Sequence, residues 1–234
     1  MTTISSDLEP TSGTNPSLRD GLPEVGERIC ENDVWVEVYA RAHMPSRFGN
    51  YEIFVFRNNV DDKEHVAMVR GDIRDQERVP MRIHSECLTG DVMGSLKCDC
   101  RDQLEYALRT FGNSETGLLL YMRQEGRGIG LGNKIRAYAL QDAGLDTVDA
   151  NRHLGFDDDL RDYTVAALMT KILGPASVQL YTNNPRKIFG LKQRGVEVET
   201  RLPIVMPSNE YNRDYLSTKA TRSGHIIPID STDS

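Results

Sequence analysis

Short runs rich in Val, Ile, Tyr and Phe fill the first half of the chain, and this composition predicts β-strands. The runs span 34–39, 51–56, 65–69 and 79–83. Polar pairs such as Asn58-Asn59 separate them. Pro80 fits the last run only near a strand start or at a sheet edge, because proline cannot donate a ladder hydrogen bond. This half therefore predicts a sheet of short strands.

From Asp99 onward the pattern alternates between helix and strand. Apolar residues recur at helical spacing at Leu104, Ala107, Leu108 and Phe111, before a Gly112-Asn113 stop signal. Further helices are predicted at 133–141, 159–173 and from 185, and strands at 117–122, 178–181 and about 196–205. A β-rich first half and a βαβ-like second half predict one α/β domain, a mixed β-sheet with flanking helices.

The charge is unevenly distributed along the 234 residues, whose formal net charge is -7. Residues 1–34 hold seven acidic residues and two arginines, which leaves 28 acidic and 26 basic residues in the rest of the chain. We therefore expect a flexible acidic N-terminal extension at 1–33 and a folded domain at 34–234. Such a charge argues against a nucleic-acid partner, but a near-neutral body can still hold a basic pocket.

No apolar run approaches the length of a membrane span, and the polar N-terminus lacks the pattern of a signal peptide. We therefore expect no membrane association and a cytoplasmic location. In that reducing compartment, cysteines are thiols, metal ligands or nucleophiles before they are disulfides. Cys30 falls in the acidic extension and is interpreted as an ordinary thiol.

Three of the four cysteines lie within fourteen residues, at Cys87, Cys98 and Cys100. Cys87 follows an apolar strand, and the other two precede a helix. The intervening segment, with Gly90 and Gly94, is long enough to fold back and bring the three sulfurs together. Thiolates are ligands suited to zinc, and three protein ligands leave a fourth position for water. Zinc in such a site lowers the pKa of its water to about 7.

Two other interpretations of these cysteines stay open. They could be unrelated buried thiols, or a closed structural zinc site with His84 as the fourth ligand. In an extended strand His84 lies on the opposite face from Cys87, because the two positions differ by an odd number of residues. This disfavours the closed site without excluding it.

Two polar turns that follow strands could bind anions. The first, residues 123–134, has four glycines at alternate positions and precedes a helix, whose N-terminus favours negative charge. Its glycine spacing matches neither a Walker A loop nor a dinucleotide fingerprint. The second, residues 181–187, places Thr182 and Lys187 around a helix that begins at Pro185. A flexible turn and a capped helix are the alternatives, but two such turns together suggest a triphosphate or a nucleotide.

Three further residues have ordinary interpretations on their own. Asp159 and Arg161 fall at the expected start of a helix, where Asp is a common cap and Arg forms surface ion pairs. Tyr138 follows the glycine-rich turn on a helix and would usually be a core aromatic residue.

In this order the motifs resemble those of GTP cyclohydrolase II, the first committed enzyme of riboflavin biosynthesis. The resemblance runs from about Arg41 to His225. It is strongest at 82–104, 123–140, 147–162, 182–187 and 209–225. Arg101 and Gly94 depart from common family residues, at positions without a functional role. The resemblance implies that residues 34–234 form the catalytic domain.

The resemblance also implies the roles of individual residues. Cys87, Cys98 and Cys100 would be the zinc ligands, Asp159 the general base, Arg161 the nucleophile, and Tyr138 would lie beside the metal-bound water. The GTP contacts would be Arg82, Ile83, His84, Ser85, Glu86, Gln103, Glu125, Gly126, Arg127, Thr147, Thr182 and Lys187. A purely electrostatic role for Arg161 stays open, because a guanidinium is almost always protonated.

The implied reaction opens the imidazole ring of GTP, releases formate from C8 and removes pyrophosphate. One Zn²⁺ per subunit and Mg²⁺ on the triphosphate would be needed, and the protein would be a homodimer. Some family members stop at the formamidopyrimidine nucleotide and lack the tyrosine that matches Tyr138, so its presence favours the full reaction. A zinc-stabilised nucleotide-binding module is the alternative from a different functional class.

Overall fold

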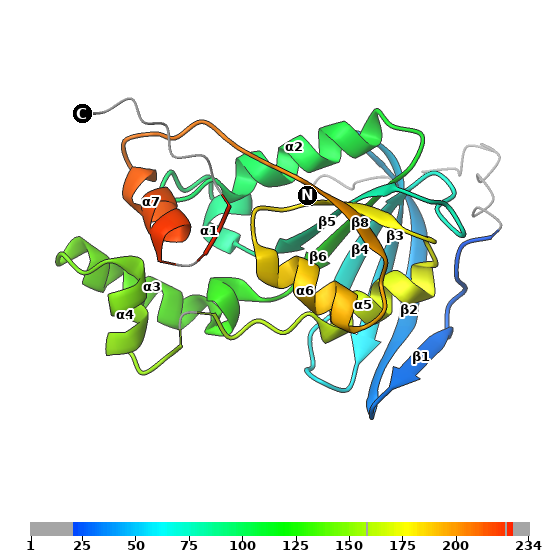
Figure 1. Cartoon of the computed structure of the whole chain (residues 1–234), viewed down its shortest axis with the longest axis horizontal. Helices are drawn as coiled ribbons and strands as arrows, with labels where there is room; N and C mark the ends of the chain where they lie inside the picture. Colours follow the sequence, from blue (N-terminus) through cyan, green and yellow to red (C-terminus); the bar gives the residue numbers. More distant parts are fainter. Residues whose placement is uncertain (1–20, 158, 223, 227–234) are drawn as a thin grey trace, which may run out of the picture.

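One eight-stranded sheet organises the chain in this computed structural model, which describes residues 21–157, 159–222 and 224–226 (Figure 1). The strands are β1 (Arg28–Glu31), β2 (Val34–Ser46), β3 (Gly49–Asn58), β4 (His65–Arg70), β5 (Val79–Ser85), β6 (Gly117–Met122), β7 (Val178–Tyr181) and β8 (Val198–Leu202). The helices are α1 (Leu88–Asp91), α2 (Cys100–Gly112), α3 (Gly130–Asp142), α4 (Thr147–His153), α5 (Thr164–Leu173), α6 (Pro185–Gln193) and α7 (Arg213–Thr221), with a 3₁₀ turn, η1 (Glu125–Gly128). None of the described helices is long and apolar enough to cross a membrane.

The sheet combines an antiparallel and a parallel half, in the order β1-β2-β3-β4-β6-β5-β7-β8. Strands β1 to β4 form an antiparallel meander, and β4 pairs antiparallel with β6. Strands β6, β5, β7 and β8 run parallel. The carboxyl ends of β5, β6 and β7 therefore meet at one edge, which lies on the left of Figure 1 near α1, α3 and α7. Ligands of open α/β sheets bind at such edges.

Helices cover both faces of the sheet. α5 and α6 pack on one face, over a core that includes Phe54, Ile83 and Leu168, and α2 packs on the other, over Tyr51 and Leu119. Leu118 and Leu119 of β6 contribute to different cores, because neighbouring side chains of a strand point to opposite faces. The fold is the single α/β domain with a mixed sheet that the hydrophobic pattern predicted.

The sheet begins before the predicted boundary at residue 33. Arg28–Glu31 pair with Val34–Glu37 as β1, and Leu22 is buried in the core. Ile29 is partly buried against the same core, but too few apolar residues surround it to give a strand pattern. The prediction of a flexible extension is thus wrong for this part, whereas residues 1–20 lie outside the described residues.

The helix predicted at 159–173 begins five residues later, at Thr164. Asp159 does not cap a helix; its carboxylate accepts hydrogen bonds from the Arg161 backbone N–H and guanidinium. Asp162 instead accepts from the Thr164 N–H at the true helix start. The local side-chain bonds of Asp159 compete with helix formation and hold this segment as a loop.

Candidate active site

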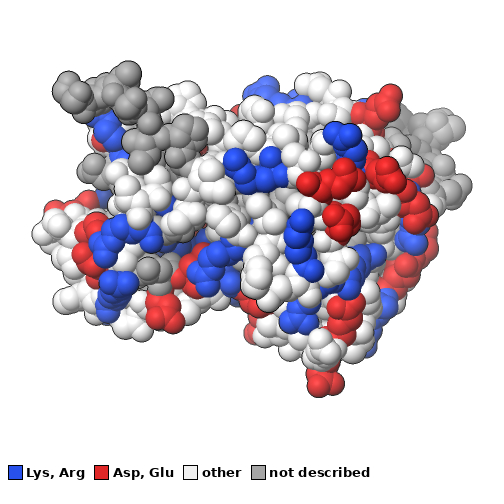
Figure 2. Space-filling model, in the orientation of Figure 1, with Lys and Arg blue, Asp and Glu red and all other residues white. Residues whose placement is uncertain are grey.

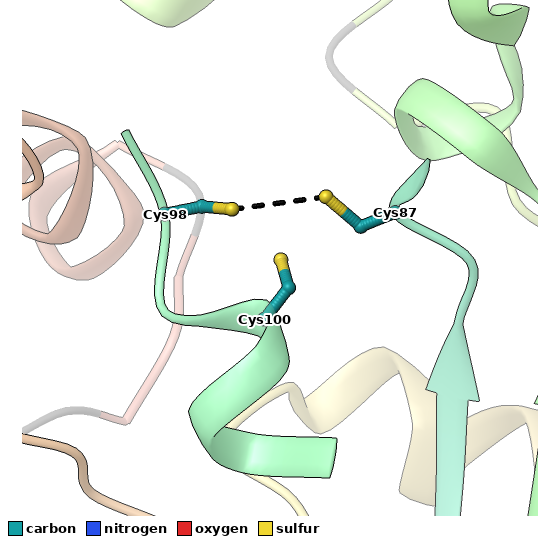
Figure 3. Close-up of side chains that lie close together, drawn as sticks. All are labelled: Cys87, Cys98 and Cys100. Atoms are coloured by element: carbon teal, nitrogen blue, oxygen red, sulfur yellow. Dashed lines mark hydrogen bonds between the residues drawn. The ribbon is translucent and has the colours of Figure 1, made fainter. Parts of the chain in front are cut away.

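The three clustered cysteines converge at the carboxyl end of β5 (Figure 3). Cys87 lies in the turn after β5, and Cys98 and Cys100 lie at the start of α2, with their side chains pointing toward one another. Their sulfurs all lie within 4.8 Å of one another, and the Cys87 and Cys98 sulfurs are 3.7 Å apart. Cys87 and Cys98 are buried and Cys100 is half-buried.

Gly90 leaves the space that this cluster needs. A Cβ added at Gly90 would lie 2.8 Å from the Cys98 sulfur and 3.1 Å from the Cys87 sulfur, so a side chain there would occupy the centre of the cluster. Three soft sulfur donors around a space without a side chain fit a zinc ion. We call Cys87, Cys98, Cys100 and Gly90 the metal wall of the site.

Lys134 of α3 supplies positive charge to the metal wall. Its Nζ lies 3.0 Å from the Cys87 sulfur and 2.8 Å from Glu125 Oε1. Hydrogen bonds from the Cys100 and Cys98 thiols, followed by that from Lys134, lower the pKa of Cys87 below its usual value. The thiolate form, which is the form that binds metal, is therefore favoured.

His84 does not belong to the cysteine cluster. Its Nε2 lies 3.1 Å from both carboxylate oxygens of Asp91, and its ring stacks on Tyr121 at a centroid distance of 5.5 Å. Asp91 also accepts hydrogen bonds from the Tyr121 hydroxyl and the Cys87 N–H. The interpretation of His84 as a fourth ligand in a closed zinc site thus finds no support among the described residues.

Basic groups also line the pocket. Arg161 binds Asp159 through Nε at 2.8 Å and Nη2 at 2.7 Å, and its Nη1 donates to the Ser85 hydroxyl at 3.2 Å. Burial opposes ionisation of Asp159, but the hydrogen bond and charge of Arg161 lower its pKa below the usual value. Burial lowers the pKa of Arg161, but the hydrogen bonds that it donates to Asp159 raise the pKa overall, so the guanidinium is a cation.

Lys187 and Arg82 lie deeper in the sheet edge. Lys187 Nζ donates to the Ile83 carbonyl at 2.7 Å, and Arg82 donates to the Tyr181 carbonyl at 3.2 Å and to Gln103 at 2.5 Å. Burial lowers the pKa of both residues, to about 10 for Arg82. We call Arg82, Arg161, Thr182 and Lys187 the anion wall, since these groups face the pocket with an excess of positive charge.

The glycine-rich turn forms a further side of the pocket. Gly126 and Arg127 both adopt left-handed backbone conformations in η1, with φ of 62° and 60°. Glu125 does not project into solvent: its carboxylate accepts from the Leu88 N–H at 2.7 Å and from Lys134. Glu125 of this turn therefore links α1, which contains Gly90 of the metal wall, to α3 through hydrogen bonds.

Tyr138 lies on α3 at the pocket, where the Lys134 ammonium is 5.7 Å from the centre of its ring. Burial raises the pKa of its hydroxyl to about 12, so the hydroxyl carries its proton at neutral pH.

One pocket contains nearly all of the residues that the sequence singled out. Those that line it are Arg82, His84, Ser85, Glu86, Cys87, Cys98, Cys100, Gln103, Glu125, Gly126, Arg127, Tyr138, Arg161, Thr182 and Lys187. Two predicted residues do not line it: the Ile83 carbonyl accepts a hydrogen bond from Lys187, and the Asp159 carboxylate is bound to Arg161. Thr147 is the first residue of α4, and its side chain is outside the described part.

The structure adds pocket residues that the sequence did not single out. They are Gln124, Ile129, Lys134, Ala137, Gln141, Asn151, Asn183, Asn184, Tyr215, Lys219 and His225. Six basic residues line the pocket against Glu86 and Glu125. On the face of the molecule drawn in Figure 2, by contrast, basic and acidic side chains are interspersed. Positive charge is thus concentrated in the pocket, where it suits one compact polyanion.

The sequence model of the family GTP cyclohydrolase II matches residues 37–203, most of the chain. The chain belongs to the GTP cyclohydrolase II family. It is 52% identical over 192 residues to the GTP cyclohydrolase-2 of Picrophilus torridus, a match that covers 82% of this chain and all of that protein. It is also 50% identical over 199 residues to the riboflavin biosynthesis protein RibBA of Synechocystis sp., covering 84% of this chain.

The relatives differ in length. The match to this chain spans 36% of the Synechocystis RibBA protein. It spans about half of several Bacillus RibBA proteins, for example 47% of that of Bacillus mycoides. Among solved structures, RibBX of A. baumannii, a two-domain 3,4-dihydroxy-2-butanone 4-phosphate synthase, aligns at 17% identity with a TM-score of 0.38 over 71% of this chain and 40% of that one. That likeness is too weak to support a conclusion.

Proposed function

We propose that this member of the GTP cyclohydrolase II family hydrolyses GTP to formate, pyrophosphate and 2,5-diamino-6-(5-phosphoribosylamino)pyrimidin-4(3H)-one. The observation that carries this proposal is that one pocket is lined both by three convergent cysteine sulfurs and by buried basic groups. A purine ring that reaches the cysteines and a triphosphate that reaches the basic groups would fit this arrangement.

Cys87, Cys98 and Cys100 would hold one zinc ion per subunit. When bound, zinc supplies Lewis acidity and activates water near neutral pH, which suits hydrolysis at C8 of guanine and then of the resulting formamide. Tyr138, protonated and close to Lys134, would donate a hydrogen bond to the formyl oxygen as the formamide is cleaved.

The anion wall would hold the triphosphate and stabilise the charge that develops at the α-phosphate. Arg161 is fixed by two bonds to Asp159, so its remaining Nη1 is directed at Ser85 on the pocket side. For Arg161 to attack phosphorus covalently, its guanidinium must first lose a proton, and Asp159 at 2.7 Å is the acceptor in reach. Without that transfer, Arg161 acts as a fixed cation while water attacks.

Two further features belong to this proposal. Mg²⁺ would enter with the triphosphate and neutralise part of its charge, and two copies of the chain would form a homodimer. Sedimentation equilibrium of the full chain tests the second point. The absence of a nucleic-acid partner and the cytoplasmic location stay predictions of the sequence.

Incubation with GTP and Mg²⁺, followed by separate assays of formate and pyrophosphate, tests the reaction. We expect both products, and mass spectrometry should find the diaminopyrimidine nucleotide. Pyrophosphate without formate would contradict the full reaction and favour the variant that stops at the formamidopyrimidine nucleotide. Tyr138→Phe should release pyrophosphate from GTP without formate.

Removal of zinc distinguishes the proposed enzyme from the alternative, a zinc-stabilised binding module. A metal that supports the fold produces an unfolded apoprotein, whereas a metal that serves only chemistry leaves a folded, inactive one. None of the three cysteines belongs to either hydrophobic core of the sheet, so we expect circular dichroism of the chelator-treated protein to show retained structure.

A further inference from the structure

The C-terminal helix α7 and residues 224–226 follow the part of the chain that the family model matches, yet they close one side of the pocket. Arg222 anchors α7 to α4 through Asp146 and through Asp149 at 3.1 Å. The Ile226 N–H donates to the Asn183 carbonyl at 2.8 Å, in the turn between β7 and α6. The chain is thus anchored on both sides of His225 in the sequence, by Arg222 before it and by Ile226 after it.

His225 is fixed between these anchors. Its backbone N–H donates to the Lys219 carbonyl at 3.1 Å, and its ring lines the pocket. The ring Nδ1 is buried and has no hydrogen-bond partner within the described part of the chain. A buried polar atom without a partner is costly, so the atom that completes this bond is expected to come from a ligand.

The groups around His225 indicate what that ligand is. Burial, followed by the charges of Lys219, Arg127, Arg161 and Lys187, lowers the pKa of His225 to about 3, so the ring is neutral at neutral pH. In the tautomer that carries its proton on Nδ1, the ring needs a hydrogen-bond acceptor, and Lys and Arg side chains cannot supply one when charged. The basic groups around the ring favour an acceptor that is anionic.

Two carboxylates that pair with the cations around His225 are already engaged. Asp99 pairs with Lys219 at 3.1 Å and accepts from Gln103, and Asp159 pairs with Arg161. Neither carboxylate forms a hydrogen bond with His225 Nδ1. A phosphate oxygen would satisfy Nδ1 and offset the charge of the surrounding cations together.

We propose that His225 donates a hydrogen bond from Nδ1 to a phosphate oxygen of the substrate, and that α7 with residues 224–226 completes a triphosphate subsite. This inference rests on the proposed function, because the substrate it names is the triphosphate of GTP. It assigns to the C-terminal segment a binding role beside the glycine-rich turn and the anion wall.

Calorimetric binding of inorganic tripolyphosphate to the zinc-loaded full chain tests the subsite without catalysis. His225→Ala should weaken binding about 10-fold or more, since it removes a hydrogen bond to a charged group. His225→Asn should retain most of the affinity, because its amide N–H can take the place of Nδ1–H, whereas His225→Gln should not. His153→Ala, which changes an exposed histidine of α4, is the matched control and should bind like the wild type.

Kinetics on GTP provide a second measurement. In His225→Ala we expect KM to rise by about the same factor, with zinc content and melting temperature unchanged. Tripolyphosphate affinity equal to that of the wild type in His225→Ala would overturn the subsite while leaving the proposed function in place. If His225→Ala loses tripolyphosphate binding and the wild-type protein releases neither product from GTP, the subsite is supported and the proposed function is overturned.

Discussion

The metal wall and the anion wall of the pocket are built in opposite ways. The metal wall comes from one short stretch of chain, Cys87 to Cys100, that folds back on itself after β5. The anion wall is assembled from β5, from the loop before α5, and from the turn after β7 together with the first turn of α6. These segments are far apart in the sequence. A compact motif suits a metal, whose ligands must meet at one point. A triphosphate is longer and can be held from several directions.

In the proposed reaction, the metal wall would serve the hydrolysis that releases formate, and the anion wall would serve cleavage at the α-phosphate. The side chains that would hold the metal are different from those that would hold the phosphates. A substitution in one wall is therefore expected to affect one product more than the other. If triphosphate cleavage precedes ring opening, loss of the anion wall stops both products, whereas loss of the metal wall stops formate alone. Four substitutions test that asymmetry.

Cys98→Ser should abolish formate release, by about 10³-fold or more, because it removes one of three ligands from the metal wall. Pyrophosphate release should stay within a few-fold of the wild-type rate. Parallel assays of the two products, with zinc measured by atomic absorption, check this. Cys30→Ser is the control, since Cys30 is exposed and outside the cluster. Equal loss of both products in a folded Cys98→Ser protein would contradict the separation of the walls.

Arg161→Ala should reduce pyrophosphate release by about 10²–10³-fold, the usual effect of removing a group that stabilises transition-state charge. Formate release should fall with it, and zinc content should stay unchanged. Pyrophosphate release at the wild-type rate would show that Arg161 has no part in cleavage at the α-phosphate, whether covalent or electrostatic.

Gly90→Ala should weaken zinc binding by about 10–100-fold, comparable to the loss of a residue that supports metal ligands. The new Cβ would lie 2.8 Å from the Cys98 sulfur. Gly132→Ala is the matched control, because a Cβ added at Gly132 meets nothing within 4 Å. Competition with a chromophoric zinc chelator measures both affinities, and equal affinities would show that the cluster is not confined by Gly90.

Lys187→Met should stabilise the free protein by about 0.5–2 kcal/mol, as often follows when a strained functional group is replaced. Burial, followed by the charges of Arg161 and Arg82, lowers the pKa of Lys187. A lysine whose pKa falls on folding destabilises the folded state below its folded pKa, and this cost disappears as the pH rises toward the unfolded value of about 10.4.

The melting-temperature difference between Lys187→Met and the wild type should therefore be largest near neutral pH and shrink as the pH rises. Tripolyphosphate should raise the melting temperature of the wild type and leave that of the variant nearly unchanged. A variant that melts lower than the wild type, and is still stabilised by tripolyphosphate, would show that Lys187 supports the fold and not an anion.

The same contrast explains how much the sequence could predict. The fold class and strands β6 and β7 followed from hydrophobic runs, and the cysteine cluster followed from spacing within fourteen residues. The start of α5 was predicted too early, because the side-chain bonds of Asp159 override the helical pattern. His225 and Lys219 were not predicted as site residues, since only the packing of α7 brings them to the pocket. The contact of Lys134 with Cys87 was not predicted either, because it requires the fold.

We infer that one pocket supports two separable reactions, pyrophosphate release and formate release. Product analysis of zinc-depleted wild-type protein tests this claim. The protein is treated with chelator, confirmed as folded by circular dichroism, and incubated with GTP and a measured excess of Mg²⁺. We predict continued pyrophosphate release, no formate, and recovery of formate when zinc is restored. Formate release that persists without zinc, or loss of both products in a protein that is still folded, would contradict the claim.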